Sequence, residues 1–140
     1  MISNNNKLVV SIVSLMMIEV SIFIHIDTPI DKNIIKFAFF AQTLGIYGIV
    51  KNNGYLKELS HVCFGTALLL ILGFSQTHYL NILNMLILFW TILSRKLYNG
   101  CLIYDCTGEN IEIIPDGPNF DFIFTTLFLL QLLKIIISVK

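Results

Sequence analysis

The fold class follows from one stretch near the amino terminus, LVVSIVSLMMIEVSIFIHI, which runs from Leu8 to Ile26. A hydrocarbon layer about 30 Å thick is crossed by roughly 20 apolar residues in an α-helix. This stretch has that length and contains a single acidic residue, Glu19. Lys7 in front of it also fits a secretory signal, but no small-residue cleavage pattern follows the run. We therefore expect a retained membrane-spanning helix.

Four further apolar runs follow the first. Turn-forming residues separate them, for example Pro29 before the second run and Asn52, Asn53 and Gly54 after it. The predicted spans cover residues 8–26, 34–50, 59–74, 79–97 and 120–139. The sequence thus predicts one all-α integral membrane domain over residues 1–140, with about five transmembrane helices in a small bundle. Because the second and third runs are short, four spans are the alternative.

A polar loop is expected at residues 98–119, between the last two spans. Its short runs Leu102 to Asp105 and Ile111 to Ile114 flank a turn, a pattern that allows a short β-hairpin. Cys101 and Cys106 lie in this loop, either as free thiols on a reducing side of the membrane or as a local disulfide on an oxidising side. Their spacing is not that of a zinc motif, so we predict no metal site.

The composition bounds the function. Hydrophobic residues make up 56% of the chain and charged residues 13%, against about 25% charged in a soluble domain, so a lipid bilayer is the expected environment. Nine basic and nine acidic residues cancel, and no Lys/Arg-rich run is present, which argues against a nucleic-acid partner. No phosphate loop, nucleophile elbow, zinc-binding helix or dinucleotide fingerprint occurs. A non-enzymatic protein without a cofactor is therefore favoured.

Basic residues orient the predicted spans, because Lys and Arg are in excess on the cytoplasmic side of membrane proteins. With the amino terminus inside, the inner side carries five of them: Lys7, Lys51, Lys57, Arg95 and Lys96. The outer side then carries three: Lys32, Lys36 and Lys140. We predict that the amino terminus is inside and the carboxyl terminus outside. The sequence does not identify which membrane this is.

Polar side chains within the spans are the candidate functional groups. A carboxylate in hydrocarbon costs about 2.5 kcal/mol or more, so Glu19 needs a proton, a partner or water. His25 lies near a predicted helix end, and the amphipathic imidazole is well accommodated there, at the membrane–water interface. The fourth span carries a polar stripe: Asn81, Asn84, Thr91 and Arg95. Such amides usually form hydrogen bonds between helices and less often line a conduction path.

Two further spans carry residues of one kind along one face. The second span has small residues on one seam, at i, i+3, i+7 and i+10: Ala38, Ala41, Gly45 and Gly48. Small residues let helix backbones approach closely, so the seam predicts packing within the chain, with a dimer face as the alternative. On the fifth span, Gln131 shares a face with Lys134, which we interpret as a solvated anchor.

Three classes of function remain open, and the weakest of them is a membrane-embedded enzyme or redox protein that uses Cys101 and Cys106. A bundle of 140 residues has little interior in which to place these stripes, so they call for protein neighbours. We therefore favour a structural or accessory subunit of a larger membrane or envelope assembly, which contacts lipid and either other proteins or further copies of this chain. The alternative is a small oligomeric ion channel or proton-coupled carrier that uses the intramembrane carboxyl of Glu19.

Overall fold

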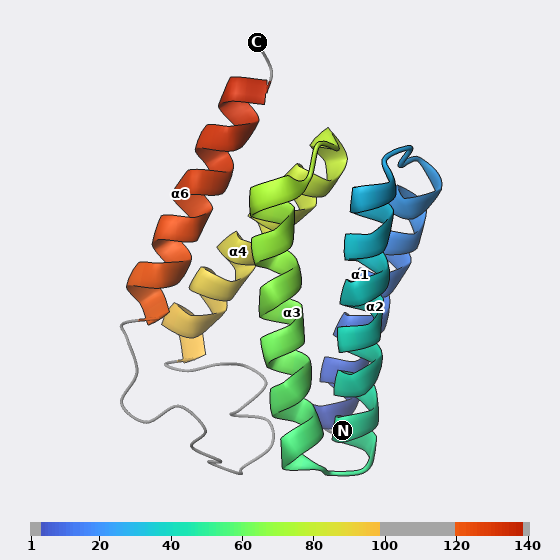
Figure 1. Cartoon of the computed structure of the whole chain (residues 1–140). Helices are drawn as coiled ribbons and strands as arrows, with labels where there is room; N and C mark the ends of the chain where they lie inside the picture. The colour runs from blue at the N-terminus through green and yellow to red at the C-terminus, as the bar shows by residue number, and fades with distance from the viewer. Residues whose placement is uncertain (1–3, 99–119, 139–140) are drawn as a thin grey trace. The chain divides into compact units, whose positions relative to one another are not determined.

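The computed structural model describes residues 4–98 and 120–138. These residues form five helices: α1 (Asn4–Ile24), α2 (Pro29–Val50), α3 (Gly54–Phe74), α4 (His78–Tyr98) and α6 (Phe120–Ser138) (Figure 1). The prediction of an all-helical chain is confirmed for this part of the sequence. The suggested β-hairpin within 102–114 lies outside the described residues.

Three helices are long and apolar enough to cross a membrane. They are α1 from Asn6 onward, α2 and α3, whereas α4 and α6 contain shorter apolar stretches, His78–Ser94 and Phe122–Ser138. By length and composition, the helices therefore agree with a membrane protein, as the sequence predicted. The exact number of crossings stays a prediction.

The helices belong to two compact units, Met1–Thr77 and His78–Lys140. In the first unit, α2 packs against both α1 and α3, and Figure 1 shows α1 behind α2 and α3 beside it. In the second unit, α4 packs against α6. Each unit is therefore held by contacts between neighbouring helices, and the polar side chains considered below lie at those contacts.

Three helices begin four or five residues before the predicted spans, and the first of them, α1, begins at Asn4 instead of residue 8. The helix α2 begins at Pro29 instead of residue 34, and α3 begins at Gly54 instead of residue 59. A hydropathy pattern stops at the first charged residues, but the helical backbone continues through them. Pro29 occupies the first turn of α2, where its fixed φ suits a helix and its missing N–H costs nothing.

Two asparagines make the turn between α2 and α3. Asn52 has a φ of 49°, a left-handed conformation that Asn adopts more readily than most residues. Its N–H donates to the Ile49 carbonyl at 3.2 Å, and the Asn53 N–H donates to the Gly48 carbonyl at 2.8 Å, as in a Schellman C-cap. Asn53 then caps α3, since its Oδ1 accepts from the Leu56 N–H at 3.1 Å. The chain thus reverses within three residues.

The small-residue seam of α2 faces α3. Its four residues are all buried: Ala38, Ala41, Gly45 and Gly48. A Cβ atom added at Gly48 would lie 2.9 Å from the backbone nitrogen of Lys57, and one at Gly45 would lie 2.6 Å from Ser60 Oγ. The Ser60 hydroxyl also donates to the Ala41 carbonyl at 2.7 Å. In this structure the seam is therefore occupied by a helix of the same chain.

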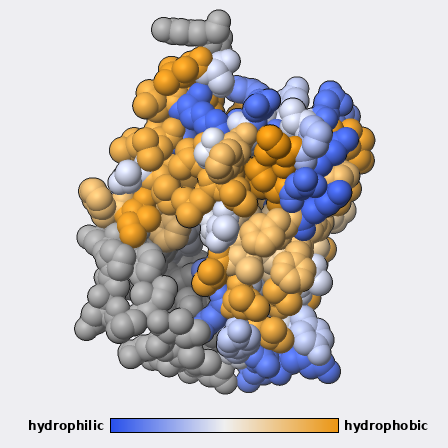
Figure 2. Space-filling view, viewed as in Figure 1, coloured by the Kyte–Doolittle hydropathy of each residue, from blue (hydrophilic) through white to orange (hydrophobic). Residues whose placement is uncertain are grey.

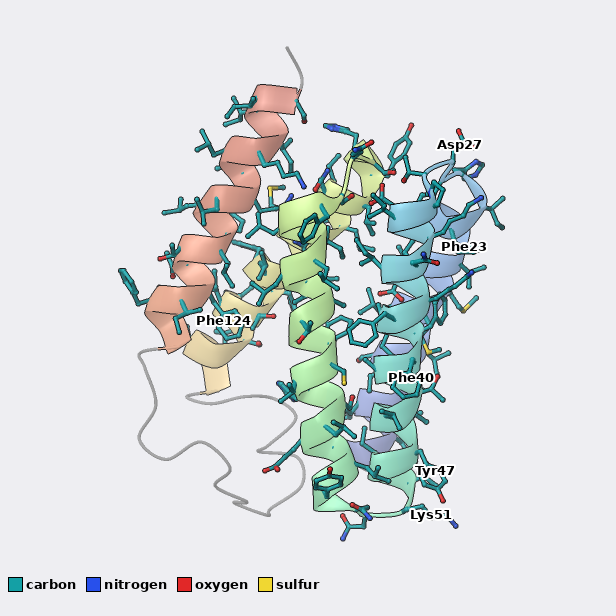
Figure 3. The ribbon with its side chains drawn as sticks, in the orientation of Figure 1. Phe23, Asp27, Phe40, Tyr47, Lys51 and Phe124 are labelled. Carbon is teal, nitrogen blue, oxygen red and sulfur yellow. The ribbon has the colours of Figure 1, made fainter. Side chains whose placement is uncertain are left out.

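The surface of the three-helix unit has polar ends and an apolar middle. Figure 2 shows hydrophilic residues gathered at its two ends, with hydrophobic ones between them. Figure 3 places Asp27 and Lys51 at opposite ends of α2, with Phe40 between. Phe40 is 56% exposed, and large apolar side chains of the other two helices are exposed as well, including Met17 of α1 at 67% and Val62 of α3 at 61%. An exposed apolar band bounded by charges suits helices surrounded by lipid.

We predict that Gly48→Ala lowers the free energy of unfolding by about 1–3 kcal/mol, as overpacking does elsewhere. The new methyl would meet the Lys57 backbone nitrogen at 2.9 Å, so α2 and α3 would have to separate. Denaturation in SDS, followed by circular dichroism, measures the change. Gly65→Ala is the matched control, because nothing lies within 4 Å of its added Cβ. Equal stability of the two variants would show that the close approach at Gly48 does not matter.

Candidate functional site

A buried carboxyl lies between α1 and α2. Glu19 is 3% exposed and Gln42 of α2 is 5% exposed. The Gln42 Nε2 group donates a hydrogen bond of 2.8 Å to Glu19 Oε1. The other oxygen of each side chain, Glu19 Oε2 and Gln42 Oε1, has no hydrogen-bond partner among the described residues. The carboxyl predicted to need a partner therefore lies beside an amide of the neighbouring helix.

Asp31 is a second buried carboxyl, in the first turn of α2. Its Oδ2 atom accepts from the Thr28 hydroxyl at 2.8 Å, from the backbone N–H groups of Gln76 at 3.3 Å and Thr77 at 3.0 Å, and from the Thr77 hydroxyl. A carboxylate in the first turn is also favoured by the helix dipole. Asp31 thus ties the start of α2 to the segment that follows α3.

Three amide side chains form a buried network in the second unit. Asn84 Nδ2 donates to Gln131 Oε1 at 2.7 Å, and Gln131 Nε2 donates to Asn81 Oδ1 at 3.0 Å. Asn84 and Gln131 are fully buried, and Asn81 is 3% exposed. The two asparagines are three residues apart, so they lie on one face of α4 and both reach a single side chain of α6. The network therefore joins α4 to α6.

The remaining predicted candidates do not join these clusters. The Thr91 hydroxyl donates to the Ile87 carbonyl of its own helix at 2.9 Å. His25 is exposed and follows the end of α1. The Arg95 side chain, Cys101 and Cys106 lie outside the part of the chain whose side chains are described. Of the predicted polar stripe on α4, the structure thus brings together Asn81 and Asn84 but not Thr91.

Sequence reasoning missed three residues of these clusters. Gln131 was interpreted as part of a solvated anchor, and this was wrong, because its side chain is fully buried between α4 and α6. Neither Gln42, which lies beside the small-residue seam, nor Asp31, which precedes the second predicted span, was singled out from the sequence. A usable signal existed for the two glutamines, since each polar group inside a span requires a partner. The predicted spans contain four amide side chains that could supply one: Gln42, Asn81, Asn84 and Gln131.

The chemistry that these clusters support is hydrogen bonding between helices. Within the described residues, no group of three or more His, Cys, Asp or Glu side chains is placed to hold a metal ion. The amides of the second unit are neutral at every ordinary pH, so they supply neither a nucleophile nor a general base. No protein-family model, curated protein or solved structure matches this chain.

We predict that Gln131→Leu lowers the free energy of unfolding by about 1–3 kcal/mol, because Asn81 and Asn84 lose their shared partner while remaining buried. Denaturation in SDS measures the loss. Thr126→Ala on the same helix is the control, since the Thr126 hydroxyl is exposed and bonds to the Phe122 carbonyl one turn earlier in its own helix. A Gln131→Leu protein as stable as the control would mean that the network does not hold α4 and α6 together.

Proposed function

We propose that this chain crosses the bilayer five times and serves as a structural or accessory subunit of a larger membrane assembly. One observation carries the proposal: the buried amides of α4 and α6 are bonded to one another. A conduction path or a catalytic site needs its polar groups turned toward water or substrate. Here Asn81, Asn84 and Gln131 instead form hydrogen bonds between helices, which is the role of polar residues in a scaffold.

The two-helix unit also supports a role beside other helices. Few of its described side chains are buried, and the largest of these are Leu80, Leu88, Asn84 and Gln131. Large apolar side chains on both helices are exposed, including Trp90 of α4 at 61% and Leu133 of α6 at 53%. Apolar surface of this kind packs equally well against lipid and against the spanning helices of a partner. A subunit that adds helices to a larger bundle needs such faces.

The proposed topology places the amino terminus inside. The helix α1 begins at the end of its unit where α2 ends and α3 begins, which brings Lys7, Lys51 and Lys57 to that end (Figure 1). Lys32 and Lys36 lie near the start of α2, at the other end. By the positive-inside tendency, we assign the end with three lysines to the inner side and the end with two to the outer side.

For the topology, we predict opposite labelling of the two chain ends in sealed vesicles of known orientation. With the native cysteines replaced by Ser, Lys140→Cys reacts with a membrane-impermeant maleimide added to the outer face. Lys7→Cys reacts only after the membrane is opened, and this sample is the control for thiol reactivity. Labelling of both positions from one side would rule out an odd number of crossings.

For the function, we predict that the tagged protein, extracted from its own membranes in mild detergent, migrates with a stoichiometric, unrelated membrane protein. Native mass measurement and identification of the co-purifying chain test this. An unrelated single-span protein carrying the same tag is the control for adventitious capture.

An oligomeric channel or proton-coupled carrier is the second candidate, and the free Oε2 atom of Glu19 within α1 is the observation that favours it. A defined homo-oligomer without a partner, showing ion or proton flux in liposomes that Glu19→Gln abolishes, would overturn the subunit proposal. Wild-type liposomes without flux, together with a co-purifying partner, would support it.

A further inference from the structure

The pair formed by Glu19 and Gln42 has an unbalanced set of donors and acceptors. The two side chains together carry three oxygen atoms and one amide nitrogen, and only one hydrogen bond joins them, from Gln42 Nε2 to Glu19 Oε1. Glu19 Oε2 and Gln42 Oε1 are both buried and both without a partner among the described residues. Two buried acceptors without a donor are costly, since each has lost its water.

The ligand that would satisfy both atoms is a donor or a cation. Among the described residues, Glu19 forms its hydrogen bond with Gln42. No lysine or arginine of the described residues forms an ion pair with Glu19. A hard metal cation is a poor fit, because such ions take about six or more oxygen ligands and two oxygens are free here. A single proton is sufficient, because a protonated carboxyl turns one of the two acceptors into a donor.

We propose that Glu19 is a proton-binding site and that it holds its proton in a cyclic acid–amide pair with Gln42. The proton resides on Glu19 Oε2, and this O–H donates to Gln42 Oε1. The Gln42 Nε2 group donates in the opposite direction, to Glu19 Oε1, as the structure shows. Each free oxygen then has a partner, and the pair is neutral.

Neutrality also accounts for the position of Glu19. An ionised carboxylate inside a span costs several kilocalories per mole unless it is paired with a cation, whereas a protonated acid with two hydrogen bonds carries no such charge. The pair is thus a polar connection between α1 and α2 that tolerates a surrounding of hydrocarbon. The protonation of Glu19 depends on no partner subunit, so this proposal can be tested separately from the proposed function.

The test is infrared spectroscopy of the full-length protein in liposomes at neutral pH. The wild type should show the carbonyl band of a protonated carboxyl, and Glu19→Gln should remove it. Glu19→Gln should also keep the wild-type midpoint of unfolding in SDS, since the new amide N–H replaces the acid O–H as donor to Gln42. Gln42→Leu should shift the band to higher frequency, because the acid loses its amide partner, and should lower the midpoint.

Thr43→Ala is the control, since the Thr43 hydroxyl is exposed and bonds to the Phe39 carbonyl of its own helix. It should leave both the band and the midpoint unchanged. Absence of a protonated carboxyl band in the wild type would overturn the proposal without reference to any variant. So would a band that responds to neither Glu19→Gln nor Gln42→Leu, because it would belong to another acid. If Glu19→Gln fails to fold, the response of the band to Gln42→Leu decides the question.

Discussion

Lipid offers no hydrogen-bond donors or acceptors, so each polar group that a spanning helix carries into hydrocarbon needs a partner within the protein. The backbone meets this requirement by forming helices, and hydroxyl side chains such as Thr43 and Thr91 meet it at carbonyls of their own helix. Several amide and carboxyl groups instead form hydrogen bonds at helix contacts. Glu19 of α1 bonds to Gln42 of α2, and Gln131 of α6 bonds to two asparagines of α4. Because each bond joins different helices, satisfying the polar groups also determines which helices are neighbours.

The helix α2 shows how two kinds of contact share one element. Its small-residue seam faces α3, where Gly48 allows the backbones to approach within a distance that no Cβ would permit. Gln42 directly follows the seam residue Ala41 in the chain, so it lies about 100° further around the helix. Its side chain faces α1, where it bonds to Glu19. One face of α2 thus packs by close approach, and a second face, about 100° around the helix, packs through a polar bond. This division explains why α2 is the most buried of the long helices.

The existence and type of the helices were predictable, because each rests on a local apolar run. Their starts were not, since Asp31 and Lys57 look like loop residues in the sequence but are buried in the first turns of α2 and α3. For the candidate sites, one member of each hydrogen-bonded pair was predictable and its partner was not. Glu19, Asn81 and Asn84 stand out as polar residues in apolar runs, but the partners of these three lie 23, 50 and 47 residues away. Local periodicity carries no information about pairing at that distance.

The attachment of α1 separates the two functional proposals in physical terms. Among its described side chains, Leu8 and Glu19 are the buried ones, and Glu19 forms the hydrogen bond to Gln42 that joins α1 to α2. A subunit that only adds helices to an assembly benefits from a neutral bond that never opens. A carrier needs the same bond to open, because a proton shared by two buried oxygens leaves only when water reaches Glu19. That opening requires α1 to move away from α2.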